Sequence, residues 1–172
     1  MGNNRITQLP PTIGHLSKLE ILNLNGNQIS ELPDTIGNAK NIKELNLSGN
    51  RFKRFPLVLT KLRKLDVVDI SSNNITSIPN DEINDLQVTE LNLNQNQLSS
   101  ISKNIAKCPR LKTLRLDENC LALEAVPVEI LTESVVSTLS TKGNLFTEKQ
   151  LSDVEGYSSY LERYTAVKRK MD

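Results

Sequence analysis

Polar and hydrophobic positions repeat along this chain every 23 residues. An asparagine followed two residues later by a bulky apolar residue recurs at that spacing at Asn4, Asn27, Asn50, Asn73, Asn96 and Asn119. A seventh, Asn144, comes after 25 residues. The two extra residues lie between Cys120 and Val126, a stretch that we expect to be a loop. A fixed period of this length predicts a solenoid of stacked coils.

From Asn27 onward, each asparagine is preceded by apolar residues eight, five and three positions earlier. Leu19, Leu22 and Leu24 form the first such set, and only the last set, which ends in Thr141, departs from the pattern. The two later members alternate with polar residues, as in a short strand that buries one face. One strand in each coil, repeated along the chain, predicts a parallel sheet.

The residues after each asparagine predict how the chain returns to the next strand. An apolar residue five positions later is usually followed by proline, as in Leu32-Pro33 and Ile78-Pro79. Proline cannot donate to a sheet ladder, so it indicates a return along the outer side of the coil. We expect a loose turn or short helix there. Apolar residues are expected to line the inner side of this segment: Ile13, Leu16, Ile36, Leu59, Leu62, Ile105 and Ile130.

The repeated asparagine has a physical role at the end of the strand. A turning backbone leaves N–H and C=O groups without partners, and a buried side-chain amide can both donate and accept hydrogen bonds. We therefore predict a structural ladder of six asparagines: Asn27, Asn50, Asn73, Asn96, Asn119 and Asn144.

These residues carry a family resemblance. The stretch from Leu19 to Pro33 has the order Leu-x-x-Leu-x-Leu-x-x-Asn-x-Ile-x-x-Leu-Pro. It resembles the intracellular 23-residue leucine-rich repeats of Ras-suppressor and scribble-type scaffolds. The resemblance implies an α/β horseshoe-shaped solenoid with a parallel concave β-sheet, an irregular or short-helical convex side, and a C-terminal capping helix.

The two ends of the chain differ in what they predict. Thr147 to Gln150 has the pattern of a capping box, and Leu151, Val154, Leu161 and Tyr164 follow at helical spacing, near Tyr157 and Tyr160. We expect residues 1–146 to form leucine-rich repeats and residues 147–172 to form a helical cap with a basic tail, divided or bent at Gly156. A helix that binds a partner is the alternative.

The N-terminal end starts at the asparagine of a coil, so the first repeat is incomplete and about six coils follow. The family resemblance implies further repeats upstream, which suggests either a shortened form or an edge that pairs with something. An uncovered parallel edge invites association. We therefore expect that this edge could self-associate, and the sequence leaves the oligomeric state open.

Side chains between the buried leucines are expected to point out of the concave face in columns. Ile21 and Val67 are predicted to be exposed there beside acidic residues, a combination that suits a protein segment carrying Lys or Arg. Arg115, Asp117 and Glu118 are as well placed to pair with one another as with a ligand. The candidate partner-binding residues are Ile21, Asn23, Asn25, Glu44, Asn46, Val67, Asp69, Glu90, Asn92, Thr113, Arg115 and Asp117.

Composition narrows the possible functions. The net charge is +1, from 21 basic and 20 acidic residues, which disfavours nucleic acid as a partner. The single histidine, His15, and two cysteines, Cys108 and Cys120, provide no zinc-ligand spacing, and both cysteines are interpreted as reduced packing residues. We expect no metal, no cofactor and no catalytic activity, and a cytoplasmic protein that binds a protein partner.

A membrane-peripheral role is the alternative function. The chain begins Met-Gly-Asn, as do relatives suspected of N-myristoylation, which would place an acyl group on Gly2. Ile6 stands where Ser or Thr is expected, so the motif is defective. Lys168-Arg-Lys170 could supply a second membrane signal, although a short basic helix end is more often simply solvated.

Overall fold

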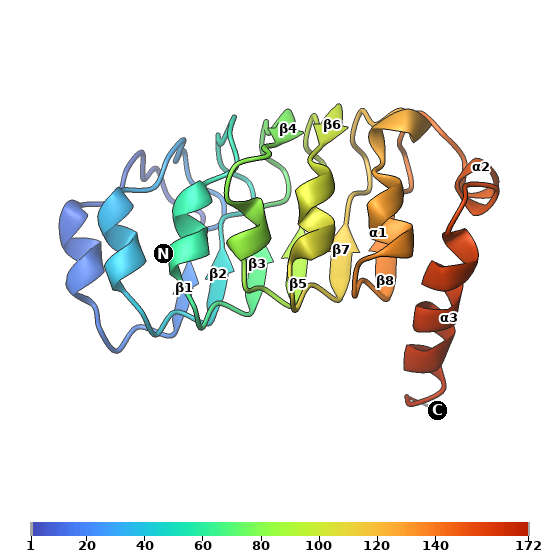
Figure 1. The fold of residues 1–172 in the computed structure, drawn as a ribbon. Coiled ribbons are helices and arrows are strands. Elements are labelled where there is room, and N and C mark those ends of the chain that lie inside the picture. The colour runs from blue at the N-terminus through green and yellow to red at the C-terminus, as the bar shows by residue number, and fades with distance from the viewer. Residues whose placement is uncertain (1, 172) are drawn as a thin grey trace.

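The computed structural model describes residues 2–171, which form a curved row of coils (Figure 1). Its 3₁₀-helices, labelled η, its α-helices and its strands follow one another in this order: η1 (Pro11–His15), β1 (Ile21–Asn23), η2 (Asp34–Asn38), β2 (Glu44–Asn46), η3 (Leu57–Lys61), β3 (Val67–Asp69), β4 (Ser77–Ile78), η4 (Ile83–Asp85), β5 (Glu90–Asn92), β6 (Ser100–Ile101), η5 (Lys103–Lys107), β7 (Thr113–Arg115), η6 (Leu123–Ala125), α1 (Val128–Thr132), β8 (Thr138–Ser140), α2 (Glu148–Ser152) and α3 (Tyr157–Lys168).

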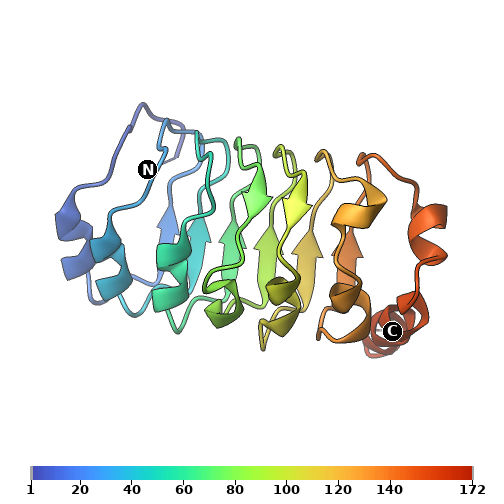
Figure 2. The same ribbon diagram turned by 45° about the horizontal axis from the view of Figure 1, so that its top comes forward.

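One strand from each coil joins a parallel sheet in the order β1-β2-β3-β5-β7-β8. Figures 1 and 2 show these strands side by side on one side of the molecule, with the short helices on the other. Equivalent residues of successive coils are in register, as in Leu22↔Leu45 and Val68↔Leu91. The predicted α/β leucine-rich-repeat solenoid, with its parallel sheet and C-terminal helix, is confirmed.

The strands are short because each coil buries few positions on this side. The central residue of a strand points inward, and Leu45, Val68 and Leu91 are almost completely buried. Two positions later another inward residue, such as Leu47 or Ile70, is fully buried. The core is consequently a continuous row of aliphatic side chains, in which each coil covers the flank of the next.

The six repeated asparagines bridge neighbouring coils. Asn73 Oδ1 accepts a hydrogen bond from the Phe52 amide at 3.0 Å, and Asn73 Nδ2 donates to the carbonyls of Leu47 and Ile70 at 3.0 and 3.1 Å. Asn50, Asn96, Asn119 and Asn144 make the same pattern of bonds. Asn27 accepts from the Ile6 amide and donates to the Leu24 carbonyl. Each asparagine side chain thus hydrogen-bonds to backbone groups of two neighbouring coils.

The convex side consists of short helices, of which η1, η2, η3 and α1 start directly after a proline. Pro10, Pro33 and Pro56 directly precede η1, η2 and η3, because proline fixes a φ suited to the first turn and needs no N–H partner. The predicted inward residues of this side are buried, with the exception of Leu16, which is 48% exposed. The prediction for Leu16 was wrong because η1 packs against η2 on one side only.

Two further features lie outside the regular repeat. β4 and β6 form a second, two-stranded parallel sheet at one edge of the solenoid, which the repeat pattern did not predict. The two extra residues after Asn119 fall in a connection that contains η6 and leads into α1. The insertion therefore lies in a connecting segment, as expected.

Two helices cover the C-terminal coil. Thr147 and Gln150 form the capping box at the start of α2, and Gly156, at a φ of 87°, separates α2 from α3. Leu151 and Tyr160 are buried against the last coil. Leu161 was wrongly predicted to join them: it is 45% exposed and points away from the core. The division into residues 1–146 and 147–172 stays a prediction.

Side chains of α3 bind backbone groups that the last coil leaves without a neighbouring strand. The Leu139 amide of β8 donates to Tyr160 Oη at 3.0 Å. Arg163 Nε donates to the Val136 carbonyl at 2.8 Å, and its Nη2 donates to Ile130 and Leu131 carbonyls at 3.1 and 2.9 Å. Figure 1 shows α3 standing across this end of the solenoid.

The opposite edge of the sheet is β1. Within residues 2–171 no strand pairs with its outer side, and Ile21 is 63% exposed. Residues ahead of η1 follow this edge through two backbone hydrogen bonds, from the Asn3 amide to the Asn25 carbonyl at 2.7 Å and from the Gln28 amide to the Ile6 carbonyl at 2.8 Å. Self-association at this edge stays a prediction.

Candidate functional site

The outward column at the start of the concave strands is the most accessible part of the predicted site. The register aligns Ile21, Glu44, Val67, Glu90 and Thr113 across five strands. Ile21 and Glu44 are exposed, whereas Val67 is half-buried and not exposed as predicted. Val67 lies in the middle of the sheet, where flanking strands cover part of its side chain.

The next column holds the ends of the strands together. Side-chain oxygens of Asn23, Asn46, Asp69 and Asn92 each accept a hydrogen bond from the backbone amide two residues later, at 2.9–3.1 Å. Short Asn and Asp side chains favour this turn because their oxygen reaches the local backbone. The recurrence of Asn or Asp at this position was a signal for the turn. The side chains of these residues therefore stabilise the turns at the strand ends, and their side-chain oxygens are already hydrogen-bonded.

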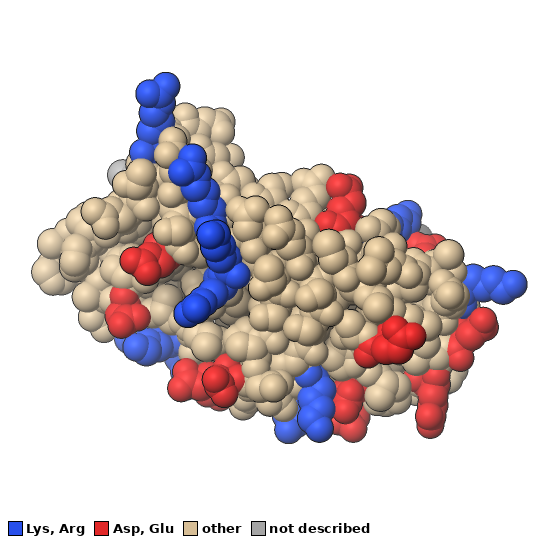
Figure 3. Space-filling view, turned by 90° about the horizontal axis from the view of Figure 1, so that it is seen from above, with Lys and Arg blue, Asp and Glu red and all other residues tan. Residues whose placement is uncertain are grey.

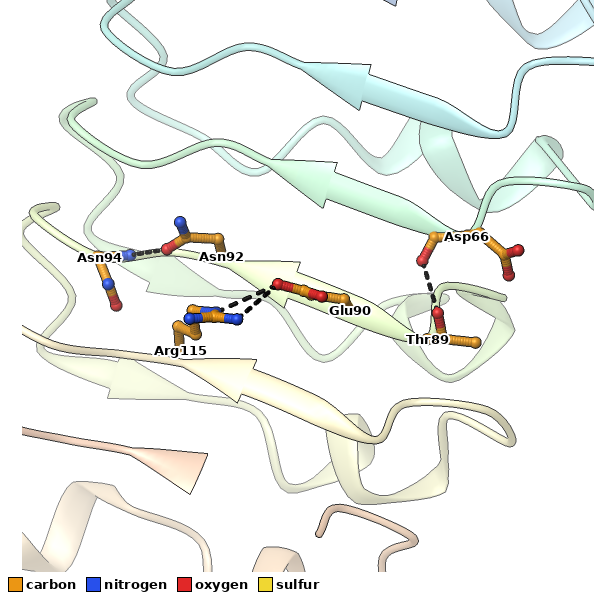
Figure 4. A network of polar contacts seen from close by, with 6 residues as sticks. All are labelled: Asp66, Thr89, Glu90, Asn92, Asn94 and Arg115. Carbon is orange, nitrogen blue, oxygen red and sulfur yellow. Dashed lines mark hydrogen bonds and ion pairs between the residues drawn. The ribbon is translucent and has the colours of Figure 1, made fainter. Parts of the chain in front are cut away.

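Polar side chains in the C-terminal half of the concave face bond to one another. Figure 4 shows Arg115 reaching across to Glu90, with Nη2 2.8 Å from Oε1. Asp117 accepts from the Lys142 amide at 2.7 Å, and its own amide donates to Asn94 Oδ1 at 2.8 Å. Glu118 accepts from Gln95 Nε2 at 3.1 Å.

Arg115, Asp117 and Glu118 thus pair with residues of neighbouring coils and not with one another. Parallel stacking places each of these residues opposite an equivalent residue of a neighbouring coil, and cross-coil contacts win over contacts within one strand end. The Arg115–Glu90 ion pair is substantially exposed, so it contributes little to stability. It does reduce the charge that Glu90 presents to a ligand.

The two halves of the concave face consequently differ in what they offer a partner. Within the described chain, the side chains of Ile21, Glu44 and Val67 have no hydrogen bond or ion pair to another residue. Asn25 and Ser48 line the same face beside them and are half-buried, whereas the half-buried Thr113 lies two strands beyond Val67. An apolar and acidic patch in the N-terminal half is thus the part of the predicted site that remains available.

The other side chains that could react or bind a metal lie apart from one another. Burial raises the pKa of the Cys108 thiol to about 12, and the charge of Asp85 adds to the effect, while Cys108 Sγ donates to the Ile83 carbonyl. Cys120 is exposed and was wrongly predicted to be a packing residue. His15 lies exposed on η1. Among residues 2–171, no cluster of His, Cys, Asp and Glu could hold a metal ion.

The N-terminal glycine and the helices bear on the membrane alternative. Gly2 is half-buried at the edge of the concave face, where a side chain at this position would meet Asn25. Over the described part of the chain, no helix has the length and apolar content needed to cross a membrane. Acylation of Gly2 stays a prediction from the sequence.

Comparison with known proteins identifies the repeats. Residues 1–52 and 63–121 match a family model described as leucine rich repeat. Among solved structures, TLR13 in its complex with ssRNA13 is similar over 83% of this chain and 21% of its own, with 28% identity and a TM-score of 0.72. The plant peptide hormone receptor RGFR1, in complex with RGF2, matches 83% of this chain and 24% of its own, with 26% identity and a TM-score of 0.67.

An internalin, inlF from Listeria monocytogenes, shares the fold at 24% identity and a TM-score of 0.64, over 84% of this chain and 39% of its own. The chain spans well under half the length of each of these three proteins. The likeness therefore concerns a run of repeats and not the whole of any of these proteins.

Proposed function

Because this chain belongs to the leucine-rich-repeat family, we propose that it is a non-catalytic scaffold or adaptor that binds one protein partner on its concave face. Leucine-rich repeats commonly serve as protein-interaction modules, since the curved sheet presents aligned side chains over a long surface. The observation that carries the proposal is the parallel register of Ile21, Glu44 and Val67, which aligns an apolar and acidic patch on that surface.

The chemistry of this patch favours a basic segment of a protein. Ile21 offers an exposed aliphatic side chain, and Glu44 and Asp69 place carboxylates beside it and beside Val67. A partner that inserts an apolar side chain and places Lys or Arg at the rim would match both features. The absence of aromatic side chains from these positions suits a modest affinity.

Protein is a better match for this surface than nucleic acid, although one similar structure, TLR13, is a complex with ssRNA13 and another, RGFR1, is a complex with RGF2. Phosphate binding relies on clustered Lys and Arg. The concave columns of this chain carry Glu44, Asp69 and Glu90, and Arg115 is already paired with Glu90. Acidic side chains in the centre of the surface would repel a phosphate backbone.

The test changes only side chains that have no structural partner. A variant with Ile21→Arg, Glu44→Lys and Val67→Arg keeps the turn made by Asp69 and the Glu90–Arg115 pair. Its matched control carries Thr12→Arg, Asp34→Lys and Asn38→Arg at exposed convex positions and gains the same positive charge. Cell lysate is passed over each immobilised protein and over the parent, and retained proteins are compared by mass spectrometry.

We expect a protein retained by the parent and by the convex control to be lost from the concave variant. Circular dichroism and a melting curve must show that all three proteins remain folded. Equal retention by the two variants would overturn the concave site. Membrane recruitment through Gly2 is tested separately, by intact mass after co-expression with an N-myristoyltransferase, where no added acyl mass rejects it.

A further inference from the structure

A groove lies on the edge of the solenoid that carries β4 and β6, away from the concave strands. Its volume is about 680 Å³, and its walls are the stretches 53–57 and 74–79 of neighbouring coils. The Asn74 amide donates to the Phe52 carbonyl at 2.8 Å, and beyond that bond no backbone hydrogen bond joins the two stretches within the described chain. The coils therefore separate at this point.

The separation has a structural cause. β4 pairs with β6 on its other side, where the Thr76 and Ile78 carbonyls accept from the Ser99 and Ser102 amides at 3.0 Å. Backbone groups alternate sides along a strand, so the N–H and C=O of Ser77 face the groove. The facing stretch, 53–57, includes Pro56, which has no N–H to offer. The groove is thus lined by an unpaired strand edge.

The charged side chains that line this groove are both positive, and the acidic residues Glu31 and Asp34 line the hollow on the other side of them. Lys53 and Arg54 line it, no acidic residue does, and neither cation takes part in an ion pair within the described chain. Both also line a hollow of about 440 Å³ on their other side, so together they form a ridge. Figure 3 shows a strip of Lys and Arg crossing this face, with uncharged atoms on the C-terminal side of the strip.

The lining of the groove is apolar beneath this ridge. Phe55 is almost completely buried at the wall, and Leu57 and Pro79 are half-buried beside it. Asn74, Thr76 and Gln97 add neutral polar groups at the rim. Cationic side chains above an apolar surface can bind a ligand that combines negative charge with an apolar side chain.

We propose that this groove is a second interaction surface, which binds an extended acidic segment of a partner protein through an apolar side chain flanked by Asp or Glu. The carboxylates pair with Lys53 and Arg54, and the apolar side chain lies against Phe55 and Leu57. The backbone of the segment hydrogen-bonds to Ser77 in the manner of peptides that add to a strand edge. This surface is opposite in charge to the concave patch, so the two select different ligands.

The test selects random short peptides displayed on phage against the immobilised full chain. Selected peptides are then labelled, and their affinities are measured by fluorescence anisotropy for the parent and three variants. Lys53→Glu with Arg54→Glu reverses the ridge, and Thr76→Trp fills the groove without changing charge. Lys61→Glu with Arg63→Glu is the matched control, because these exposed cations belong to the same basic stretch but do not line the groove.

We expect selected peptides to contain Asp or Glu around an aromatic residue or leucine. Their binding should weaken at least about tenfold in the ridge variant and in Thr76→Trp, and stay unchanged in the control. Equal weakening by both charge variants would show attraction to net charge alone and overturn the proposal. Selection of peptides without acidic residues, or of none, would overturn it as well. Failure of the concave variant to lose its partner would leave this result unaffected.

Discussion

The two ends of the solenoid solve the problem of a terminal coil differently. At the C-terminal end, α3 buries Tyr160 against the last coil and joins Arg163 to three backbone carbonyls of residues 130–136. At the N-terminal edge of the described chain, the outer flank of the first coil is partly open, and Leu16 and Ile21 are exposed. One end is sealed by side chains of a helix, and the other presents its flank.

The difference shows what a coil needs from its neighbour. In the interior, the amide of each ladder asparagine donates to carbonyls of its own and the preceding coil, as Asn73 does to Leu47 and Ile70. No further asparagine follows at the C-terminal end, and the guanidinium of Arg163 donates to the last carbonyls there. Side-chain donors thus replace the next coil, while aliphatic burial is completed by the tyrosines of α3.

The largest predicted effect is at this sealed end. Arg163→Ala removes a charged donor from three carbonyls, so we expect a loss of about 3 kcal/mol in the free energy of unfolding, measured by urea denaturation. Arg163→Lys should recover only part of this lost stability, because an ammonium group cannot reproduce the planar, forked geometry of the guanidinium. The exposed Arg169→Ala is the control. A midpoint for Arg163→Ala equal to that control would show that α3 does not seal the coil through this residue.

An interior ladder position should give a somewhat smaller effect. Asn73→Ala leaves the Phe52 amide and two carbonyls without their partner, which costs about 2 kcal/mol. The neighbouring Asn74→Ala removes a similar side chain that is exposed, and it should leave the melting temperature unchanged. If the two variants melt together, the asparagine ladder does not stabilise the coils.

Tyr160 makes the stability of the sealed end depend on pH. Burial of the phenol raises the pKa of Tyr160, opposed by its hydrogen bond with the Leu139 backbone. Because the neutral phenol is favoured in the fold, its contribution is complete below the unfolded tyrosine pKa of about 10 and is lost as pH rises through the folded value. Tyr160→Phe should cost about 1 kcal/mol at neutral pH.

The same substitution should flatten the alkaline decline in stability. Urea midpoints are measured on both sides of the tyrosine pKa for Tyr160→Phe and for Tyr157→Phe, whose ring is only half-buried. An alkaline decline that persists fully in Tyr160→Phe would place the responsible group elsewhere.

The strict period explains why the sheet could be predicted so fully from the sequence. Leu22, Leu45 and Val68 recur where one coil must cover the next, so the spacing alone specifies strand, register and buried face. The binding site was harder to predict, because residues at the same outward positions can either stabilise a turn or contact a ligand. Asn46 and Asp69 were taken for a binding column, although their side chains close the strand ends.

Departures from the repeat were the least predictable. Leu161 has the helical spacing of a core residue only if α2 and α3 are one continuous helix. Gly156 separates the two helices, so a different face of α3 meets the last coil. The groove beside β4 depends on which neighbour a strand edge pairs with, and no single coil encodes that choice. Tyr160 and Arg163 find backbone partners more than 20 residues away, so only the folded chain reveals their role.

The smallest effect should be found at the open edge. Ile21→Lys replaces an aliphatic side chain that is 63% exposed, so little burial is lost and the free energy of unfolding should change by less than about 0.5 kcal/mol. Leu22→Ala, one residue along the same strand, removes a buried side chain and should cost at least about 2 kcal/mol. Urea denaturation at low and high protein concentration compares the two. A large, concentration-dependent loss for Ile21→Lys alone would mean that this edge is covered by a second copy of the chain in solution.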